Sequence, residues 1–294
     1  MAAAGLRKPT VRQVELDHVG VVARDLAAVS ALYEQLGFTL TPLAHQADGR
    51  VGNRCVILHG SYLELLAVVD PTRGSATLDR FLARYAGAHI AAFRVDDPSA
   101  ELARLRLAGI AAPAVGHVER AVDETDPAGS RARFALIQLP DQPEGRLNLL
   151  RHLTPEALWQ DRFLRHANHA ATLEVVEFVV ADPWTTAVRV SRLIGCVAVP
   201  DQLGGVALEL AHGIVRILPA DGEAAVVPCI AGLCLRTFDG NAELRRRLVE
   251  HGVPHVADGV AVIVPAIAAG GVRLRFLPGA GDSHSEKACG TDAP

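Results

Sequence analysis

The chain has 294 residues, half of them hydrophobic, and a formal net charge of −4 with acidic and basic residues interspersed. This composition predicts a globular protein of about two domains, and the absence of a basic face excludes a nucleic-acid-binding surface. No run approaches the ~20 apolar residues that a membrane span needs, and neither a signal peptide nor a disulfide framework is indicated. We therefore expect a cytoplasmic protein with no nucleic-acid or membrane partner.

The first half of the chain contains the same small unit twice, in the order strand, helix and three strands. In the first unit the period of the apolar residues predicts a strand at 14–23, a helix at 25–36, and strands near 38–43, 52–58 and 61–69. After a short helix near 78–85, the second unit has a strand at 89–95, a helix at 98–108, and strands near 110–120, 132–139 and 145–152.

The second half repeats this pattern less clearly. A third unit begins at Leu173 with a helix at 184–194, and a fourth begins at Cys229 with a helix at 241–251. We expect an α+β fold of four βαβββ modules in two domains. The predicted divisions are a first domain (1–153), a linker (154–171), a second domain (172–278) and a disordered tail (279–294).

Two histidines occupy similar places in the first two units. His18 lies seven residues before Asp25, and His89 lies seven residues before Asp96, at the turn into each helix. Between them Glu64 interrupts an apolar strand, Tyr62-Leu63-Glu64-Leu65-Leu66. Pairing of the two first strands would bring both imidazoles to one face of a sheet. Two imidazoles and a carboxylate suit a divalent metal such as Fe(II), Mn, Zn, Ni or Co. Without the repeat, partly buried histidines and a salt-bridged glutamate would be the simpler interpretation.

These residues also carry a family resemblance. The stretch Leu16-Asp17-His18-Val19-Gly20, then Leu36-Gly37-Phe38, Gly52-Asn53-Arg54 and Tyr62-Leu63-Glu64-Leu65, resembles the glyoxalase-like branch of the vicinal oxygen chelate superfamily. The segment from Thr154 to Trp159 resembles that branch's inter-domain stretch. The resemblance implies that two modules form a cup-shaped mixed sheet, flanked by helices, around one divalent metal.

By this correspondence the metal ligands would be His18, Glu64 and His89, and Asn148 would stand at the fourth position, where no acid is present. The third and fourth units offer no such set, because Val176 and Gly232 fall where histidines would lie. Arginines, Arg216 with Arg273 or Arg275, lie on their final strands. The second domain is therefore expected to be a degenerate copy.

Asn53 and Arg54 lie where a strand begins and are candidates for binding a substrate oxyanion, since a guanidinium grips carboxylates in a bidentate manner. A turn asparagine and a surface arginine are the alternative.

The resemblance favours a metalloenzyme that chelates vicinal oxygens of a small substrate for isomerase, epimerase or lyase chemistry, with Glu64 as the available catalytic base. An Fe(II)-dependent dioxygenase with a 2-His-1-carboxylate site is the alternative. A non-catalytic small-molecule binding protein is a second alternative, and a homodimer is possible.

Overall fold

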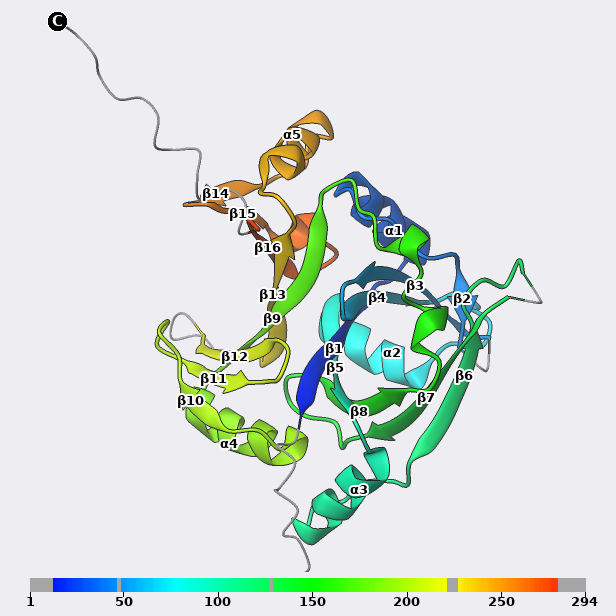
Figure 1. The fold of residues 1–294 in the computed structure, drawn as a ribbon, viewed down its shortest axis with the longest axis vertical. Coiled ribbons are helices and arrows are strands. Elements are labelled where there is room, and N and C mark those ends of the chain that lie inside the picture. Colours follow the sequence, from blue (N-terminus) through cyan, green and yellow to red (C-terminus); the bar gives the residue numbers. More distant parts are fainter. Residues whose placement is uncertain (1–12, 47–48, 127–128, 221–226, 280–294) are drawn as a thin grey trace, which may run out of the picture.

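Two eight-stranded mixed sheets make up the molecule (Figure 1). The computed structural model describes residues 13–46, 49–126, 129–220 and 227–279. The two sheets repeat one strand order, since each is symmetric about a central antiparallel pair of strands. The predicted α+β fold of repeated modules is therefore confirmed. None of the helices in the described ranges is long and apolar enough to cross a membrane.

The first sheet has the order β2-β3-β4-β1-β5-β8-β7-β6. Its strands are β1 (Val14–Val22), β2 (Ala44–His45), β3 (Val51–Leu58), β4 (Ser61–Val68), β5 (Gly87–Val95), β6 (Gly116–Ala121), β7 (Arg131–Gln138) and β8 (Arg146–His152). β1 pairs with β5 antiparallel and with β4 parallel, and β5 pairs with β8 parallel. The sheet curls until β2 lies near β6, which produces the cup seen in Figure 1.

Three helices accompany the first sheet, α1 (Leu26–Gln35), α2 (Ala76–Leu82) and α3 (Pro98–Leu107). The carboxylates of Asp25 and Asp97 accept hydrogen bonds from backbone N–H groups at the starts of α1 and α3, which are otherwise without partners. Helix α2 packs Leu78 and Phe81 against Val22 and Leu66 and so closes one end of the cup.

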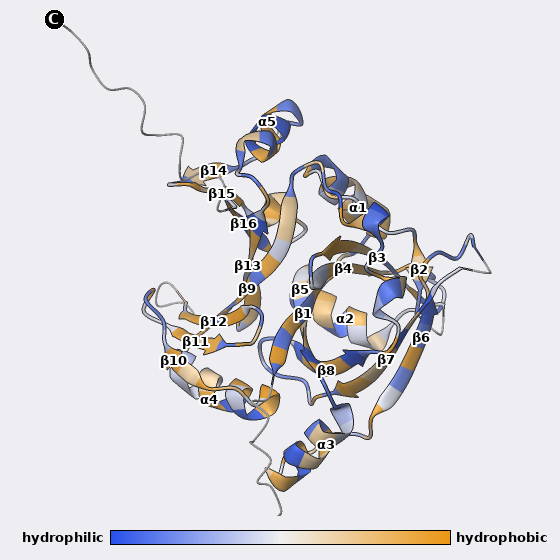
Figure 2. Cartoon of the chain, viewed as in Figure 1, coloured by the Kyte–Doolittle hydropathy of each residue, from blue (hydrophilic) through white to orange (hydrophobic). Residues whose placement is uncertain are grey.

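The second sheet has the order β10-β11-β12-β9-β13-β16-β15-β14. Its strands are β9 (Ala170–Val180), β10 (Ala198–Pro200), β11 (Val206–Glu209), β12 (Ile214–Pro219), β13 (Cys229–Thr237), β14 (Val256–Asp258), β15 (Ala261–Val264) and β16 (Arg273–Leu277). Helices α4 (Pro183–Ile194) and α5 (Ala242–Glu250) belong to it. Figure 2 shows that the strands of both sheets are richer in hydrophobic residues than the exposed sides of the helices.

The two sheets share one hydrophobic core, which contains Leu16 and Phe93 of the first and Val176 and Phe178 of the second. Their backbones come close where Gly87 meets Gly271, since a Cβ on Gly271 would lie 1.9 Å from the carbonyl oxygen of Ala86. The sheets therefore pack as one body.

The connection between the sheets contains two 3-10 turns, Pro155–Ala157 and Asp161–Phe163. His166 and Asn168 in this stretch are buried and hydrogen-bond to the backbone at Ile57 and Leu36. They hold the connection against the first sheet. The division into domains at 153 and 172 stays a prediction, and 280–294 of the predicted tail lies outside the described residues.

Candidate metal and substrate site

His18 is the central polar residue of the first sheet's cup. Its Nδ1 lies 2.7 Å from the carboxylate of Asp17, and its ring stacks on Tyr62 with the centroids 4.3 Å apart. The carboxylate favours a proton on Nδ1, which leaves the lone pair on Nε2. That Nε2 faces Glu64, 3.9 Å from Oε2.

Glu64 lies on β4 beside His18, and its side chain is only 13% exposed. The side-chain N–H of Asn53, on the neighbouring strand β3, donates to its Oε1 at 2.5 Å. One carboxylate oxygen is therefore fixed by Asn53, and the other is directed toward the imidazole of His18.

His89 does not join this pair. It is the extra residue of a β-bulge in β5, because Gly20 pairs with Ile90 and Val21 with Ala88. Its ring stacks between Phe81 and Tyr85 at 4.8 and 4.0 Å, and its Nε2 donates to the Tyr85 carbonyl at 2.9 Å. Burial lowers the pKa of His89, so the ring is held in the neutral form as a packing residue.

His89 is not the counterpart of His18 because the two modules align with a shift of one residue from the predicted alignment. Asp97, not Asp96, caps α3 as Asp25 caps α1. Counting back seven residues from each cap gives His18 in β1 and Ile90 in β5. Ile90 lines the cup, while His89 is turned toward α2. The predicted equivalence of His18 and His89 is corrected accordingly.

Asn148 occupies the position on β8 that Glu64 occupies on β4. Glu64 lies opposite Gly20 in β1, and Asn148 lies opposite Ala92, the counterpart of Gly20 in β5. Asn148 lines the cup, and its side-chain carbonyl oxygen is buried without a hydrogen-bond partner. The carbonyl oxygen of Asn53 is unpartnered in the same way.

Asn53 and Arg54, the two predicted substrate-binding residues, lie on opposite faces of β3. Asn53 lines the cup. Arg54 points away from it, donates to the Thr41 carbonyl at 3.0 Å and pairs with Glu34 at 3.0 Å. An alternating strand puts neighbours on opposite faces, so only one of the pair can face the cavity.

The cup encloses a cavity of about 390 Å³. Its floor carries His18, Glu64 and Asn148. Its other wall comes from the β6–β7 hairpin and β8 and combines apolar with polar side chains, namely Val118, Phe134, Leu136 and Leu150 with Arg120, Gln138 and Arg146. This volume suits a small organic molecule.

Three residues of the site were not predicted from the sequence, namely Asp17, His152 and Arg120. Asp17 is completely buried and lies between His18 and His152. Its Oδ2 is 2.8 Å from Nε2 of His152. Burial opposes ionisation of Asp17, but hydrogen bonds from His152 and His18 outweigh it and lower the pKa of Asp17. For Asp17, its place beside His18 in an otherwise apolar strand was the sequence feature that could have indicated a role in the site.

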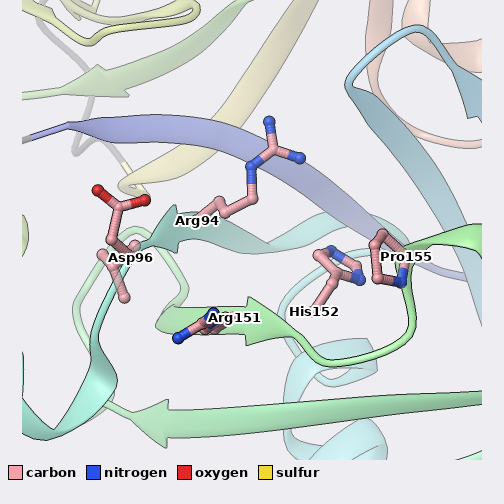
Figure 3. A pocket seen from close by; sticks show the side chains of 6 residues that line it. Arg94, Asp96, Arg151, His152 and Pro155 are labelled. Carbon is pink, nitrogen blue, oxygen red and sulfur yellow. The ribbon is translucent and has the colours of Figure 1, made fainter.

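Behind this buried trio lies a second, smaller pocket of about 330 Å³ at the ends of β5 and β8. Figure 3 shows His152 in its lining together with Arg94 and Arg151. Arg94 pairs with Glu15 and approaches Asp17 at 3.7 Å. The imidazole of His18 is thus oriented from outside the cup by a charged cluster.

The donor set of the cup is smaller than the predicted one. Within the described ranges, no three His, Cys, Asp or Glu side chains are grouped so that they could hold a metal ion. What converges is one imidazole, one carboxylate and amide oxygens without partners. Imidazole, carboxylate and amide carbonyl groups are ligands of divalent cations, so these residues fit a metal, with fewer strong ligands than predicted.

The corresponding place in the second sheet is occupied by ion pairs. Glu177 on β9 lies opposite Arg216 and Gly232 and pairs with Arg216 at 3.2 Å and with Arg273 at 2.6 Å. By the register, Arg216 stands where Glu64 does, and Arg275 where Asn148 does. The degenerate second domain stays a prediction, and by the register Val175, not Val176, is the counterpart of His18.

The fold and the cup define a class of protein. The family model for a glyoxalase-like domain matches residues 16–194, which is more than half of the chain. The chain therefore belongs to the glyoxalase-like domain family. A search of curated protein sequences gives no match.

Solved structures share the whole two-sheet fold. A hypothetical protein from Staphylococcus aureus has a TM-score of 0.67 at 13% identity, over 90% of this chain and 99% of its own. A mutant 4-hydroxymandelate synthase from Streptomyces coelicolor has a TM-score of 0.62 at 12% identity, over 91% and 93%. A Mn(II)-bound glyoxalase from Novosphingobium aromaticivorans has a TM-score of 0.54 at 15% identity, over 94% and 87%. The family model confirms the glyoxalase-like resemblance, and these structures confirm the α+β fold with two eight-stranded sheets.

Proposed function

We propose that the chain is a glyoxalase-like metalloenzyme whose single divalent metal site lies in the cup of the first sheet. His18 and Glu64 are the principal ligands, and the amide oxygen of Asn148 is the third. The observation that supports this set is the convergence of His18 Nε2 and Glu64 Oε2 at 3.9 Å, in a cup where the Asn148 oxygen has no partner. One of the solved structures with this fold is a Mn(II)-bound glyoxalase.

A metal bound there would act as a Lewis acid toward neighbouring oxygens of a small substrate, as isomerase and lyase chemistry requires. The protein's own groups have separate tasks. Asp17 holds the imidazole of His18 with Nε2 toward the cup. Asn53 holds Oε1 of Glu64, which leaves Oε2 to bind a cation or accept a proton.

The test is elemental analysis of the purified parent and of three variants, before and after reconstitution with Mn(II), Fe(II) and Zn(II). We expect about one metal ion per chain in the parent, and loss of that metal in His18→Ala and in Glu64→Gln. His89→Gln is the matched control and should keep its metal, since His89 faces α2. A folded parent that holds no metal under any condition would rule the proposal out.

A small-molecule binding protein without metal is the second candidate. The observation that favours it is Ile90, an apolar side chain at the position of the second histidine. An Fe(II) dioxygenase with two histidine ligands has less support, because within the described residues the cup contains His18 as its single imidazole. Reconstitution followed by assay in the presence and absence of oxygen separates these functions.

A further inference from the structure

Arg120 is a buried cation whose nearest acidic partner in the cup, Glu64, acts on it electrostatically from beyond ion-pair distance. It lies on β6, is only 8% exposed and lines the cavity, with its guanidinium directed toward β3. Its guanidinium donates to the sulfur of Cys55 at 3.7 Å and lies 5.9 Å from the centre of the Phe134 ring. Within the described ranges, Arg120 makes no ion pair with any carboxylate. A buried charge without a partner is costly, and such groups mark binding sites.

The other charged side chains of the cup are already committed. Arg146 pairs with Asp141 at 3.0 Å and packs on Phe81. Glu64 is held by Asn53 and faces His18. Of the two guanidinium groups that line this cavity, that of Arg120 is the one without a carboxylate within ion-pair distance in the described residues.

Arg120 also borders an outer groove that contains acidic residues. Two of these acids have other partners, since Glu119 pairs with Arg131 and Glu124 lies 2.6 Å from Nδ1 of His45. Neither of these two acids makes an ion pair with Arg120 in the described residues.

We propose that the cup binds a carboxylic acid with an apolar body, the carboxylate on the guanidinium of Arg120 and the body along Val118, Phe134 and Leu136. A guanidinium matches a carboxylate with two parallel hydrogen bonds, and the burial of Arg120 strengthens them. The inference rests on the proposed use of this cup as the substrate site. It deepens that proposal by naming the substrate class and a residue that selects it.

The test compares acids with their own amides. Benzoate, phenylacetate and hexanoate are each titrated into the protein by calorimetry. Their affinities are compared with those of the corresponding amides, benzamide, phenylacetamide and hexanamide. A chelator is present, so that coordination to a metal cannot favour the acids. In the parent we expect at least one acid to bind roughly tenfold or more tightly than its amide, the gain of a charge-assisted pair.

Arg120→Gln should abolish this preference. Arg120→Lys should retain part of it, because a lysine keeps the positive charge but cannot bind a carboxylate in a bidentate manner. Arg131→Gln is the control, since Arg131 is on the same hairpin but exposed and paired with Glu119. Equal binding of acids and amides by the parent, or no binding of any acid, overturns the inference without any variant. A preference that survives in a folded Arg120→Gln also overturns it.

The outcome is separable from the metal proposal. If metal binding depends on His18 and Glu64 while the parent shows no preference for acids, the metal site stands and the carboxylate inference fails. If the preference depends on Arg120 but no metal binds, the reverse holds.

Discussion

Two small residues give the cup its floor. Gly20 separates Glu64 from Ile90 across the strands, and a Cβ on Gly20 would lie 3.0 Å from the Cβ of Ile90. Ala92 separates His18 from Asn148 in the same way. The four larger side chains are therefore arranged around a low centre, His18 and Glu64 from the first module and Ile90 and Asn148 from the second. A single residue, Ile90, therefore makes the difference between the ligands present in the cup and a site with two histidines.

Restoring that histidine is a direct test. Ile90→His should place a second imidazole beside Glu64 and strengthen Mn(II) or Zn(II) binding by at least about tenfold, since imidazole is a strong ligand for such ions. Calorimetric titration of metal into parent and variant measures the change. Unchanged affinity in a folded variant would argue against a metal centre at this position.

His89 carries a pH prediction of its own. Burial lowers its pKa in the folded protein, so below about pH 6.5 the unfolded chain binds a proton that the folded chain resists. Stability should therefore fall as the pH drops below 6.5, by at most about 1.4 kcal/mol per pH unit for one such group. Urea unfolding at several pH values should show a shallower decline in His89→Gln. Identical slopes in parent and variant would contradict this account.

The positions of the helices could be predicted from the sequence, but the residue that caps α3 could not. The helices predicted from apolar spacing at 25–36, 98–108 and 184–194 agree closely with α1, α3 and α4. The predicted 38–43 strand is instead irregular chain, with a two-residue strand at Ala44–His45, because edge strands carry little periodic signal. Asp96 and Asp97 stand side by side, and the sequence offered no means to tell the cap from its neighbour. The bulge at His89 is set by packing against α2, which no local pattern records.

The two aspartates can be distinguished by stability. Asp97 accepts from the N–H groups of Ser99 and Ala100, so Asp97→Ala should lower the free energy of unfolding by about 1 kcal/mol. Asp96 is exposed and does not cap the helix, so Asp96→Ala should change it by less than about 0.5 kcal/mol. Urea denaturation of both variants checks the assignment. A larger loss from Asp96→Ala would mean that Asp96, not Asp97, caps α3.

Across the whole molecule, the second sheet serves the first as a packing partner. Its own centre is filled by Glu177 and two arginines, and its residues share the core of the first sheet. The hydroxyl of Tyr33 on α1 reaches the carbonyl of Ala269 in the second half of the chain. Substitutions at the contact between the sheets should therefore destabilise the cup as well.

Gly271 is the most demanding position of that contact. It has φ +93, and an added Cβ would overlap the backbone of Ala86. Gly271→Ala should cost at least about 3 kcal/mol from backbone strain and overpacking together. Gly109→Ala is the control, because Gly109 also has positive φ (+70) but nothing within 4 Å of the added carbon, and it should cost only about 1–2 kcal/mol. Equal losses in thermal unfolding would mean that the sheets do not touch at Gly271.

The central pairing of β1 with β5 has a consequence for assembly. Antiparallel partners are related by a local two-fold axis, and here the two partners belong to successive copies of one module. A lone first module, residues 14–68, would leave β1 as a long unpaired edge. Two such fragments could meet edge to edge, just as β1 meets β5, and rebuild a symmetric cup. In that homodimer each fragment would contribute one His18 and one Glu64, so the symmetric cup would contain a second imidazole at the place that Ile90 occupies in the full chain.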